Sequence, residues 1–124
     1  LLLMKEKIEG FGFSVVCAES HKEALEKLRN EKFAVIILDI GLKAKSGLTI
    51  VDFIRDNSNS LNRLTPILIN SGLIAAEVID EYRDKVNDFF VKPVDYELLE
   101  LKLQEWSTKR LKEPSRANKV SKNV

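Results

Sequence analysis

The chain has 124 residues, with 20 Lys and Arg against 19 Asp and Glu, so its net charge is +1. This length suits one globular domain, and the near-neutral charge gives no general attraction to nucleic acid or to an anionic membrane. The single cysteine, Cys17, excludes an intrachain disulfide, and no apolar run reaches the roughly 20 residues needed to span a bilayer. We therefore expect a cytoplasmic protein.

Helical and strand patterns alternate along the chain. In chain order they predict a helix over 1–9, a strand over 13–18, a helix over 20–30, a strand over 33–40, a helix over 48–56, a strand over 66–70, a helix over 73–86, a strand over 88–91 and a helix from 95 to about 106. The strands are near-continuous apolar runs, which is typical of strands covered on both faces. The alternation predicts an α/β fold, a doubly wound parallel sheet with helices on both faces.

Three of the predicted strands end in polar residues that suit one site. The strand over 33–40 carries Asp39, the strand over 66–70 leads to Ser71, and the strand over 88–91 leads to Lys92. The carboxyl ends of parallel strands meet at one edge of the sheet, so we expect the three side chains to converge. Phosphoryl transfer onto Asp39 is the chemistry that such a set favours, with Ser71 and Lys92 holding phosphoryl oxygens and Mg²⁺ offsetting the charge. The plainer alternative is that Lys92 only neutralises a buried Asp39.

These residues stand in motifs that resemble a known family. Val35-Ile36-Ile37-Leu38-Asp39, Gly47, Pro66 to Gly72 and Phe89-Phe90-Val91-Lys92-Pro93 are similar, in order and spacing, to the receiver domain of two-component response regulators. The resemblance covers roughly residues 1–107 and implies a flavodoxin-like fold. It assigns residues 1–107 to the receiver domain and leaves 108–124 as a basic tail or linker.

The resemblance implies a role for each site residue. Asp39 matches the phosphoacceptor, which also binds Mg²⁺, and Gly41 matches the position whose backbone carbonyl binds the same ion. Lys92 matches the invariant lysine. Ser71 matches the switch hydroxyl, which together with Lys92 takes part in catalysis.

Two further positions complete the match. Pro93 matches a proline that follows the lysine through a cis bond, and Phe89 matches an aromatic switch. In the family, this switch remodels a face formed by the fourth helix, the last strand and the last helix. Here that face corresponds to residues 75–85, Phe89 and residues 96–105.

The predicted order begins with a helix, whereas the family begins with a central strand that ends in an acidic, Mg²⁺-binding pair. That strand is missing from this sequence, and the pair is expected upstream of Leu1. Three explanations stay open: the start is missing from this sequence, the protein is a degenerate receiver, or a neighbouring chain donates the strand. The connection over 57–63 is also slightly long for the family.

The function that follows from the resemblance is that of a signalling domain rather than a metabolic enzyme. We expect phosphorylation by a sensor histidine kinase, coupling to an output domain or downstream protein, and a possible homodimer through the face of the fourth helix, last strand and last helix. One alternative is a pseudo-receiver, a protein-interaction module that works without phosphorylation. A second is a nucleotide- or flavin-binding protein of similar fold.

Overall fold

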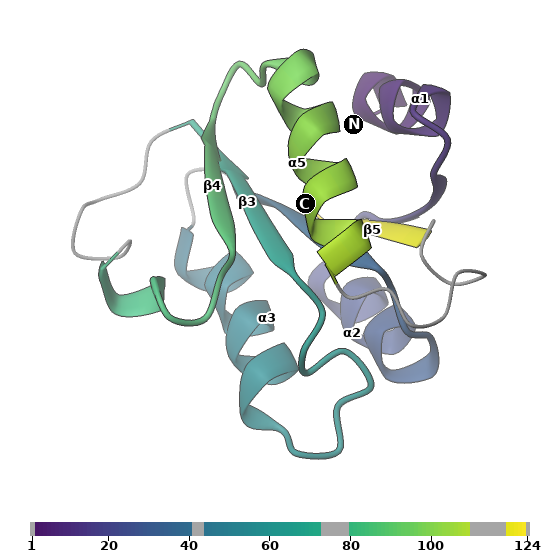
Figure 1. Cartoon of the computed structure of the whole chain (residues 1–124). Helices are drawn as coiled ribbons and strands as arrows, with labels where there is room; N and C mark the ends of the chain where they lie inside the picture. Colours follow the sequence, from purple (N-terminus) through teal and green to yellow (C-terminus); the bar gives the residue numbers. More distant parts are fainter. Residues whose placement is uncertain (1, 41–43, 73–79, 110–118, 124) are drawn as a thin grey trace.

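The structure, a computed structural model, describes residues 2–40, 44–72, 80–109 and 119–123, and for 119–123 it describes the backbone (Figure 1). Its elements in chain order are α1 (Leu2–Gly10), β1 (Ser14–Ala18), α2 (His21–Asn30), β2 (Val35–Ile40), α3 (Ala44–Asp56), β3 (Ile67–Ser71), β4 (Asp88–Val91), α5 (Tyr96–Lys109) and β5 (Lys119–Asn123). The four predicted strands are confirmed to within a residue or two. The helix predicted over 73–86 lies partly outside the described residues; residues 80–82 are helical, and a turn follows at 83–85.

Local side-chain hydrogen bonds explain where α2 and α5 begin. The Ser20 hydroxyl accepts a hydrogen bond from the Glu23 N–H at 3.1 Å, and the Glu23 carboxylate accepts one from the Glu19 N–H at 2.8 Å. Asp95 accepts hydrogen bonds from the N–H groups of Glu97 and Leu98 at the start of α5. Both caps satisfy backbone donors that a helix leaves without partners in its first turn.

The sheet is parallel throughout, with helices on both faces. Its strand order is β1-β5-β2-β3-β4. In Figure 1, α1 and α5 lie on one side of the sheet and α2 and α3 on the other. The predicted fold class is confirmed.

Alternation along β2 divides the core into two layers. Ile36, Leu38 and Ile40 belong to the layer beneath α2 and α3. Val35 and Ile37 belong to the layer beneath α1 and α5. A strand with both faces covered has no solvent side, which explains why β2 is an almost continuous apolar run.

The strand β5 was not predicted. The sequence assigns residues 108–124 to a tail or linker, but residues 119–123 form the central strand, paired with β1 on one side and with β2 on the other. The polar sequence Lys-Val-Ser-Lys-Asn carries none of the apolar signal that marks the other strands. The boundary at residue 107 stays a prediction.

The long connection between α3 and β3 has a structural purpose. Its Asn62 is fully buried and bonds to two other segments of the chain. The Asn62 side-chain oxygen accepts from the Phe33 N–H at 2.8 Å, and its NH₂ group donates to the carbonyl oxygens of Leu28 and Glu31. This one amide therefore supplies partners for the backbone between α2 and β2.

Replacing Asn62 by Ala should destabilise the fold. The Phe33 N–H and the Leu28 carbonyl would lose the buried hydrogen bonds that Asn62 supplies, at an expected cost of about 3 kcal/mol in the free energy of unfolding. Urea denaturation measures this cost. The control is Asn59→Ala, an exposed position in the same connection that should change the free energy by less than about 0.5 kcal/mol. Equal effects of the two variants would contradict this account.

Candidate functional site

Three strands bring the predicted site residues to one edge of the sheet. Asp39 is the fifth residue of β2, Ser71 is the last residue of β3, and Lys92 directly follows β4. The Lys92 N–H donates to the Ser71 carbonyl at 2.8 Å, so the two segments are joined at this point. Asp39 and Lys92 are in contact as the sequence predicts, and Ser71 lies next to Lys92 through its backbone.

An ion pair between Asp39 and Lys92 is the central contact of this edge. The Lys92 Nζ lies 2.5 Å from the Asp39 Oδ1. The Asp39 side chain is only 14 % exposed, whereas that of Lys92 is 37 % exposed. A carboxylate this deep in an apolar strand is costly unless it is paired, and the lysine supplies the opposite charge from the solvent side.

Asn70 is a site residue that the sequence analysis missed. It is the register partner of Asp39 in β3 and of Phe90 in β4, and it is 3 % exposed. Its Oδ1 has no hydrogen-bond partner among the described residues. Lys92 follows β4 and pairs with Asp39 in β2, so its side chain spans β3, the strand in which Asn70 is the register partner of Asp39. The sequence feature that could have pointed to Asn70 is an amide side chain inside an otherwise apolar strand. A buried polar side chain normally has a hydrogen-bond partner or a functional role.

Phe89 and Pro93 lie beside this edge. Phe89 is the register partner of Ile69 and packs against the core layer beneath α2 and α3. Ser71 follows Ile69 by two residues and so points to the same face. The Lys92–Pro93 peptide bond is cis, as the resemblance implies.

The predicted Mg²⁺ site is only partly within the described residues. Gly41 lies outside them, so its carbonyl is not placed. Within the described ranges, no group of three or more His, Cys, Asp and Glu side chains lies together as a metal site. The described part of this edge offers the Asp39 carboxylate, which already pairs with Lys92, so these residues alone do not fit a Mg²⁺ site.

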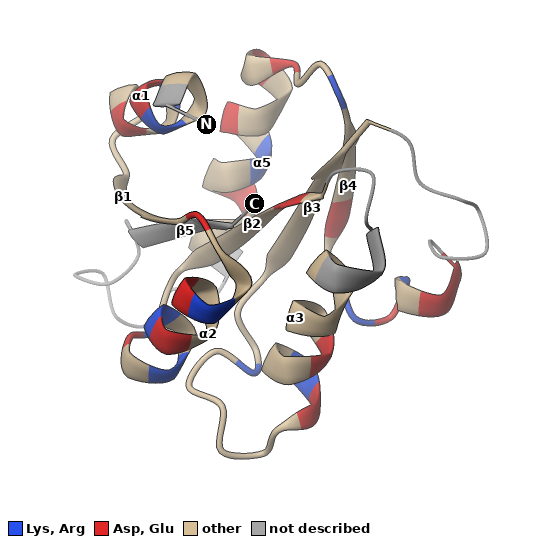
Figure 2. Ribbon diagram, turned by 180° about the vertical axis from the view of Figure 1, so that it is seen from behind, with Lys and Arg blue, Asp and Glu red and all other residues tan. Residues whose placement is uncertain are grey.

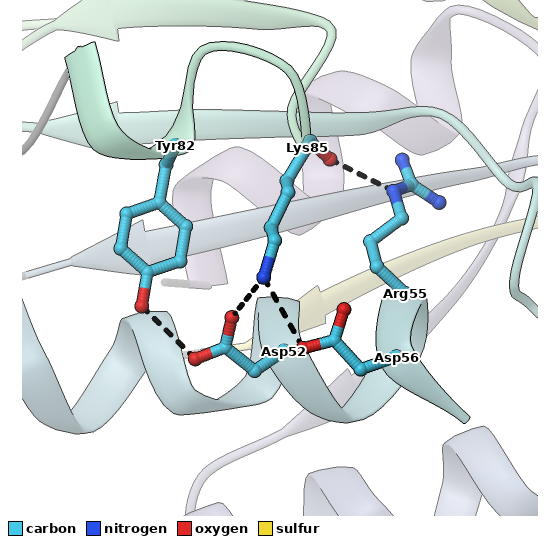
Figure 3. A network of polar contacts seen from close by, with 5 residues as sticks. All are labelled: Asp52, Arg55, Asp56, Tyr82 and Lys85. Carbon is cyan, nitrogen blue, oxygen red and sulfur yellow. Dashed lines mark hydrogen bonds and ion pairs between the residues drawn. The ribbon is translucent and has the colours of Figure 1, made fainter.

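A second polar network joins α3 to residues 82–85 (Figure 3). The Tyr82 hydroxyl donates to Asp52 at 3.0 Å, and the Lys85 ammonium contacts Asp52 at 2.8 Å and Asp56 at 3.2 Å. Burial, together with the bond to Asp52, raises the pKa of Tyr82 above its ordinary 10.0. Hydrogen bonds to Asp52 and Asp56 raise the pKa of Lys85 above its ordinary 10.5.

Arg55 anchors the opposite edge of the sheet. Its guanidinium donates to the carbonyl oxygens of Lys85 and Arg63 and to the side chain of Asn87. The same Asn87 oxygen accepts from the Ile67 N–H at 2.8 Å. The starts of β3 and β4 are therefore fixed to the end of α3, far from the edge that carries Asp39.

The described surface shows mixed charge. Figure 2 shows acidic and basic residues interspersed on α2 and on α3. Among the described helices, none combines the length and the apolar character needed to cross a membrane.

Comparisons with known proteins agree on a family. The family model for the response regulator receiver domain matches residues 1–104. The transcriptional regulatory protein ZraR of Escherichia coli K12 is 24 % identical over 103 residues, which are 82 % of this chain and 22 % of ZraR. The transcriptional regulatory protein CrdR of Helicobacter pylori is 28 % identical over 102 residues, which are 82 % of this chain and 46 % of CrdR. This chain therefore spans less than half the length of each relative.

Solved structures agree with the fold. The chemotaxis protein CheY4 of Vibrio cholerae superposes with a TM-score of 0.72 and 28 % identity, over 84 % of this chain and 86 % of CheY4. A response regulator from Thermotoga maritima superposes with a TM-score of 0.68 over 85 % of both chains, and at 22 % identity it supports the fold alone. One further relative found by sequence is a kinase. The sensor histidine kinase AruS of Pseudomonas aeruginosa is 33 % identical over 75 residues, which are 60 % of this chain and 8 % of AruS.

The network in Figure 3 predicts a loss of stability at alkaline pH. Because the folded-state pKa values of Tyr82 and Lys85 are raised, the folded protein keeps protons that the unfolded chain has released. The network therefore makes its full contribution to the free energy of unfolding below about pH 10. This contribution is lost as the pH rises through the folded-state pKa values of the two groups. Asp52→Asn should cost on the order of 1 kcal/mol of unfolding free energy at about pH 8 and less at about pH 11.

Urea denaturation at the two pH values measures this difference. The control is Asp80→Asn, which removes an exposed ion pair with Arg83 and should show little cost at either pH. A cost of Asp52→Asn that stays constant with pH would contradict the coupling.

Proposed function

Because this chain belongs to the response regulator receiver domain family of two-component systems, we propose that it accepts a phosphoryl group on Asp39. The observation that carries the proposal is the ion pair between Asp39 and Lys92, formed next to Ser71 at the carboxyl edge of the sheet. A lysine that meets the incoming phosphoryl oxygens must lie beside the nucleophile, and the contact between Lys92 and Asp39 supports that role.

The proposed reaction uses the side chains of this edge. An Asp39 carboxylate oxygen attacks phosphorus and forms an acyl phosphate, while the bond to the donor breaks and its electron pair leaves with the donor. The Lys92 ammonium moves from Asp39 to a phosphoryl oxygen, and the Ser71 hydroxyl donates to another. The chain positions and neutralises the group, which is most of what phosphoryl transfer requires.

Asn70 is proposed as a positioning residue for Lys92. The ammonium has three N–H donors, of which Asp39 takes one. When Lys92 turns to the phosphoryl group, the Asn70 Oδ1 is a second acceptor along its path. This role would satisfy a buried oxygen that has no partner among the described residues.

Receiver domains generally bind Mg²⁺ at an acidic pocket. The described residues do not fit that site by themselves, so no step above depends on the ion. When bound, Mg²⁺ would offset the negative charge of carboxylate and phosphoryl group.

A change at Asp39 would be transmitted through the face that holds Ser71 and Phe89. We expect Ser71 to move towards the phosphoryl group and Phe89 to follow into the vacated space. Tyr82 packs against the same core layer as Phe89 and is hydrogen-bonded to Asp52. We therefore expect the movement of Phe89 to displace residues 80–85, which belong to the face that the family remodels.

Response regulators generally interact with sensor histidine kinases, and such a kinase is the proposed phosphoryl donor. The transcriptional regulators similar to this chain are longer than it is, so an output domain or separate downstream protein is a further proposal. We also propose that the chain can form a homodimer through the face made of α5, β4 and the helix predicted before β4.

One observation favours a second candidate, the pseudo-receiver. The ion pair with Lys92 by itself neutralises the largely buried Asp39 carboxylate, which is all that a structural role requires. A pseudo-receiver would use the same fold to bind a partner without phosphorylation. Such a protein would keep Asp39 and Lys92 as a structural ion pair only.

The proposed function predicts an acyl phosphate on Asp39. After incubation with acetyl phosphate and Mg²⁺, an intact-mass spectrum should show one phosphoryl adduct, because Asp39 is the one carboxylate of the described residues that pairs with a lysine at the carboxyl edge. Asp39→Asn should abolish the adduct, while Asp52→Asn, which removes another carboxylate, should retain it. An adduct that survives in folded Asp39→Asn would sink the assignment, and no adduct on the folded wild type would favour the pseudo-receiver.

The positioning role of Asn70 predicts a separable kinetic effect. Asn70→Leu keeps the size of the side chain but removes the acceptor, and it should slow adduct formation by about tenfold, a cost of about 1.4 kcal/mol. The loss should fall on the maximal rate and not on the acetyl phosphate concentration at half-saturation. Asn70→Asp, which keeps an acceptor oxygen, should recover part of the rate. A wild-type rate in Asn70→Leu would contradict the role.

A further inference from the structure

Gly47 belongs to the motifs that this sequence shares with the receiver family, but the proposed reaction gives it no role. It is the fourth residue of α3. Ile50, Val51 and Ile54 follow it at intervals of three, four and seven residues, and all three are buried in the core layer beneath α2 and α3. Gly47 therefore lies on the buried face of α3, where an amphipathic helix normally carries an apolar side chain.

Ile40 occupies the space that a side chain at residue 47 would need. A methyl group added to Gly47 would lie 3.1 Å from Ile40 Cγ1 and 3.5 Å from Ile40 Cδ1. Carbon atoms in contact are normally about 3.5–4.0 Å apart. Ile40 is 2 % exposed, so the packed core leaves it little room to withdraw. The absence of a side chain at residue 47 therefore lets α3 approach the end of β2 closely.

Ile40 connects this close approach to the candidate site. It directly follows Asp39 in β2, and it is the register partner of Ser71 in β3. The side chains of Ile40 and Ser71 point to the same face of the sheet, on strands about 4.8 Å apart. The other register partner of Ser71 is Val91, which is 72 % exposed, so Ile40 is the buried one of the two. A displacement of Ile40 would reach Asp39 along the chain and Ser71 across the sheet.

We propose that Gly47 is a positioning residue of the candidate site: it leaves Ile40 in place beneath α3, and Ile40 holds Asp39 and Ser71 in the geometry that phosphoryl transfer needs. The inference rests on the proposed function, since it gives both residues a role in that reaction. A purely structural role of Gly47 predicts a different result, because it would affect the stability of the fold but not the reaction rate of the folded protein.

Gly47→Ala should lower both the stability and the reaction rate. Replacing Gly by Ala inside a helix normally stabilises a protein, so a lower urea midpoint would mean that the contact with Ile40 outweighs this gain. In the folded variant, the maximal rate of adduct formation from acetyl phosphate and Mg²⁺ should fall about fivefold, because small misplacements of reacting groups slow a reaction strongly. The acetyl phosphate concentration at half-saturation should not change. Intact-mass spectra taken over time measure both quantities.

Gly10→Ala is the matched control. Gly10 is the last residue of α1, and a methyl group added there meets nothing within 4 Å. This variant should keep the wild-type rate, and its urea midpoint should not fall.

The contact also predicts a coupling between Gly47 and Ile40. Ile40→Ala removes the Cγ1 and Cδ1 atoms that the new methyl group would meet. Made in the Ile40→Ala background, Gly47→Ala should therefore slow the reaction by less than about twofold, because the two changes are not additive. An equal loss of rate in the two backgrounds would contradict the contact.

A second pair of variants leaves Gly47 unchanged and is expected to fold, because an exchange of Ile for Leu conserves the volume. Ile36 and Ile40 lie in the same strand and the same core layer, and both are almost fully buried. Ile40→Leu changes the shape of the core beside Asp39 and Ser71, and it should slow adduct formation about threefold. Ile36→Leu makes the same exchange four residues away and should react at the wild-type rate.

The results separate this inference from the proposed function. Absence of an adduct on the folded wild type would overturn the proposed function and, with it, the role of Gly47. If the wild type forms the adduct, a wild-type maximal rate in folded Gly47→Ala would overturn the positioning role alone. Equal rates in Ile40→Leu and Ile36→Leu would do the same.

Discussion

The ion pair between Asp39 and Lys92 is the contact on which the rest of the site depends. Asp39 stands in a strand whose other residues are apolar and buried, so its carboxylate is tolerable only with a nearby positive charge. Lys92 can supply that charge because the parallel sheet brings the ends of β2 and β4 to one edge. The same proximity is what phosphoryl transfer to Asp39 would use, so structural and chemical demands coincide here.

The two edges of the sheet differ in how they are held. At the amino edge, Arg55 and Asn87 fix the starts of β3 and β4 with several hydrogen bonds. At the carboxyl edge, Lys92 forms an ion pair with Asp39 and donates its backbone N–H to the Ser71 carbonyl, and Asn70 has an oxygen without a partner among the described residues. The amino edge is therefore held by hydrogen bonds to a helix, whereas the carboxyl edge carries the charged groups of the candidate site.

Much of this arrangement could be predicted from the sequence because it follows from local patterns. Apolar runs predicted four strands, the pattern between them predicted helices that begin near residues 20 and 95, and the strand ends pointed to Asp39, Ser71 and Lys92. Three features could not be predicted in this way. Residues 119–123 owe their place to backbone pairing with distant strands, Asn62 bonds to segments about thirty residues away, and Asn70 matters through its register with Asp39. Each depends on contacts between remote parts of the chain, which local pattern does not encode.

The central claim is that Asp39 is the residue that receives the phosphoryl group, and chemical trapping tests it most directly. Borohydride reduces an aspartyl phosphate to homoserine but leaves free carboxylates unchanged. Wild-type protein incubated with acetyl phosphate, reduced and then mapped by peptide mass spectrometry should contain homoserine at position 39 and at no other aspartate. Homoserine at another aspartate, or none in folded protein, would contradict the account.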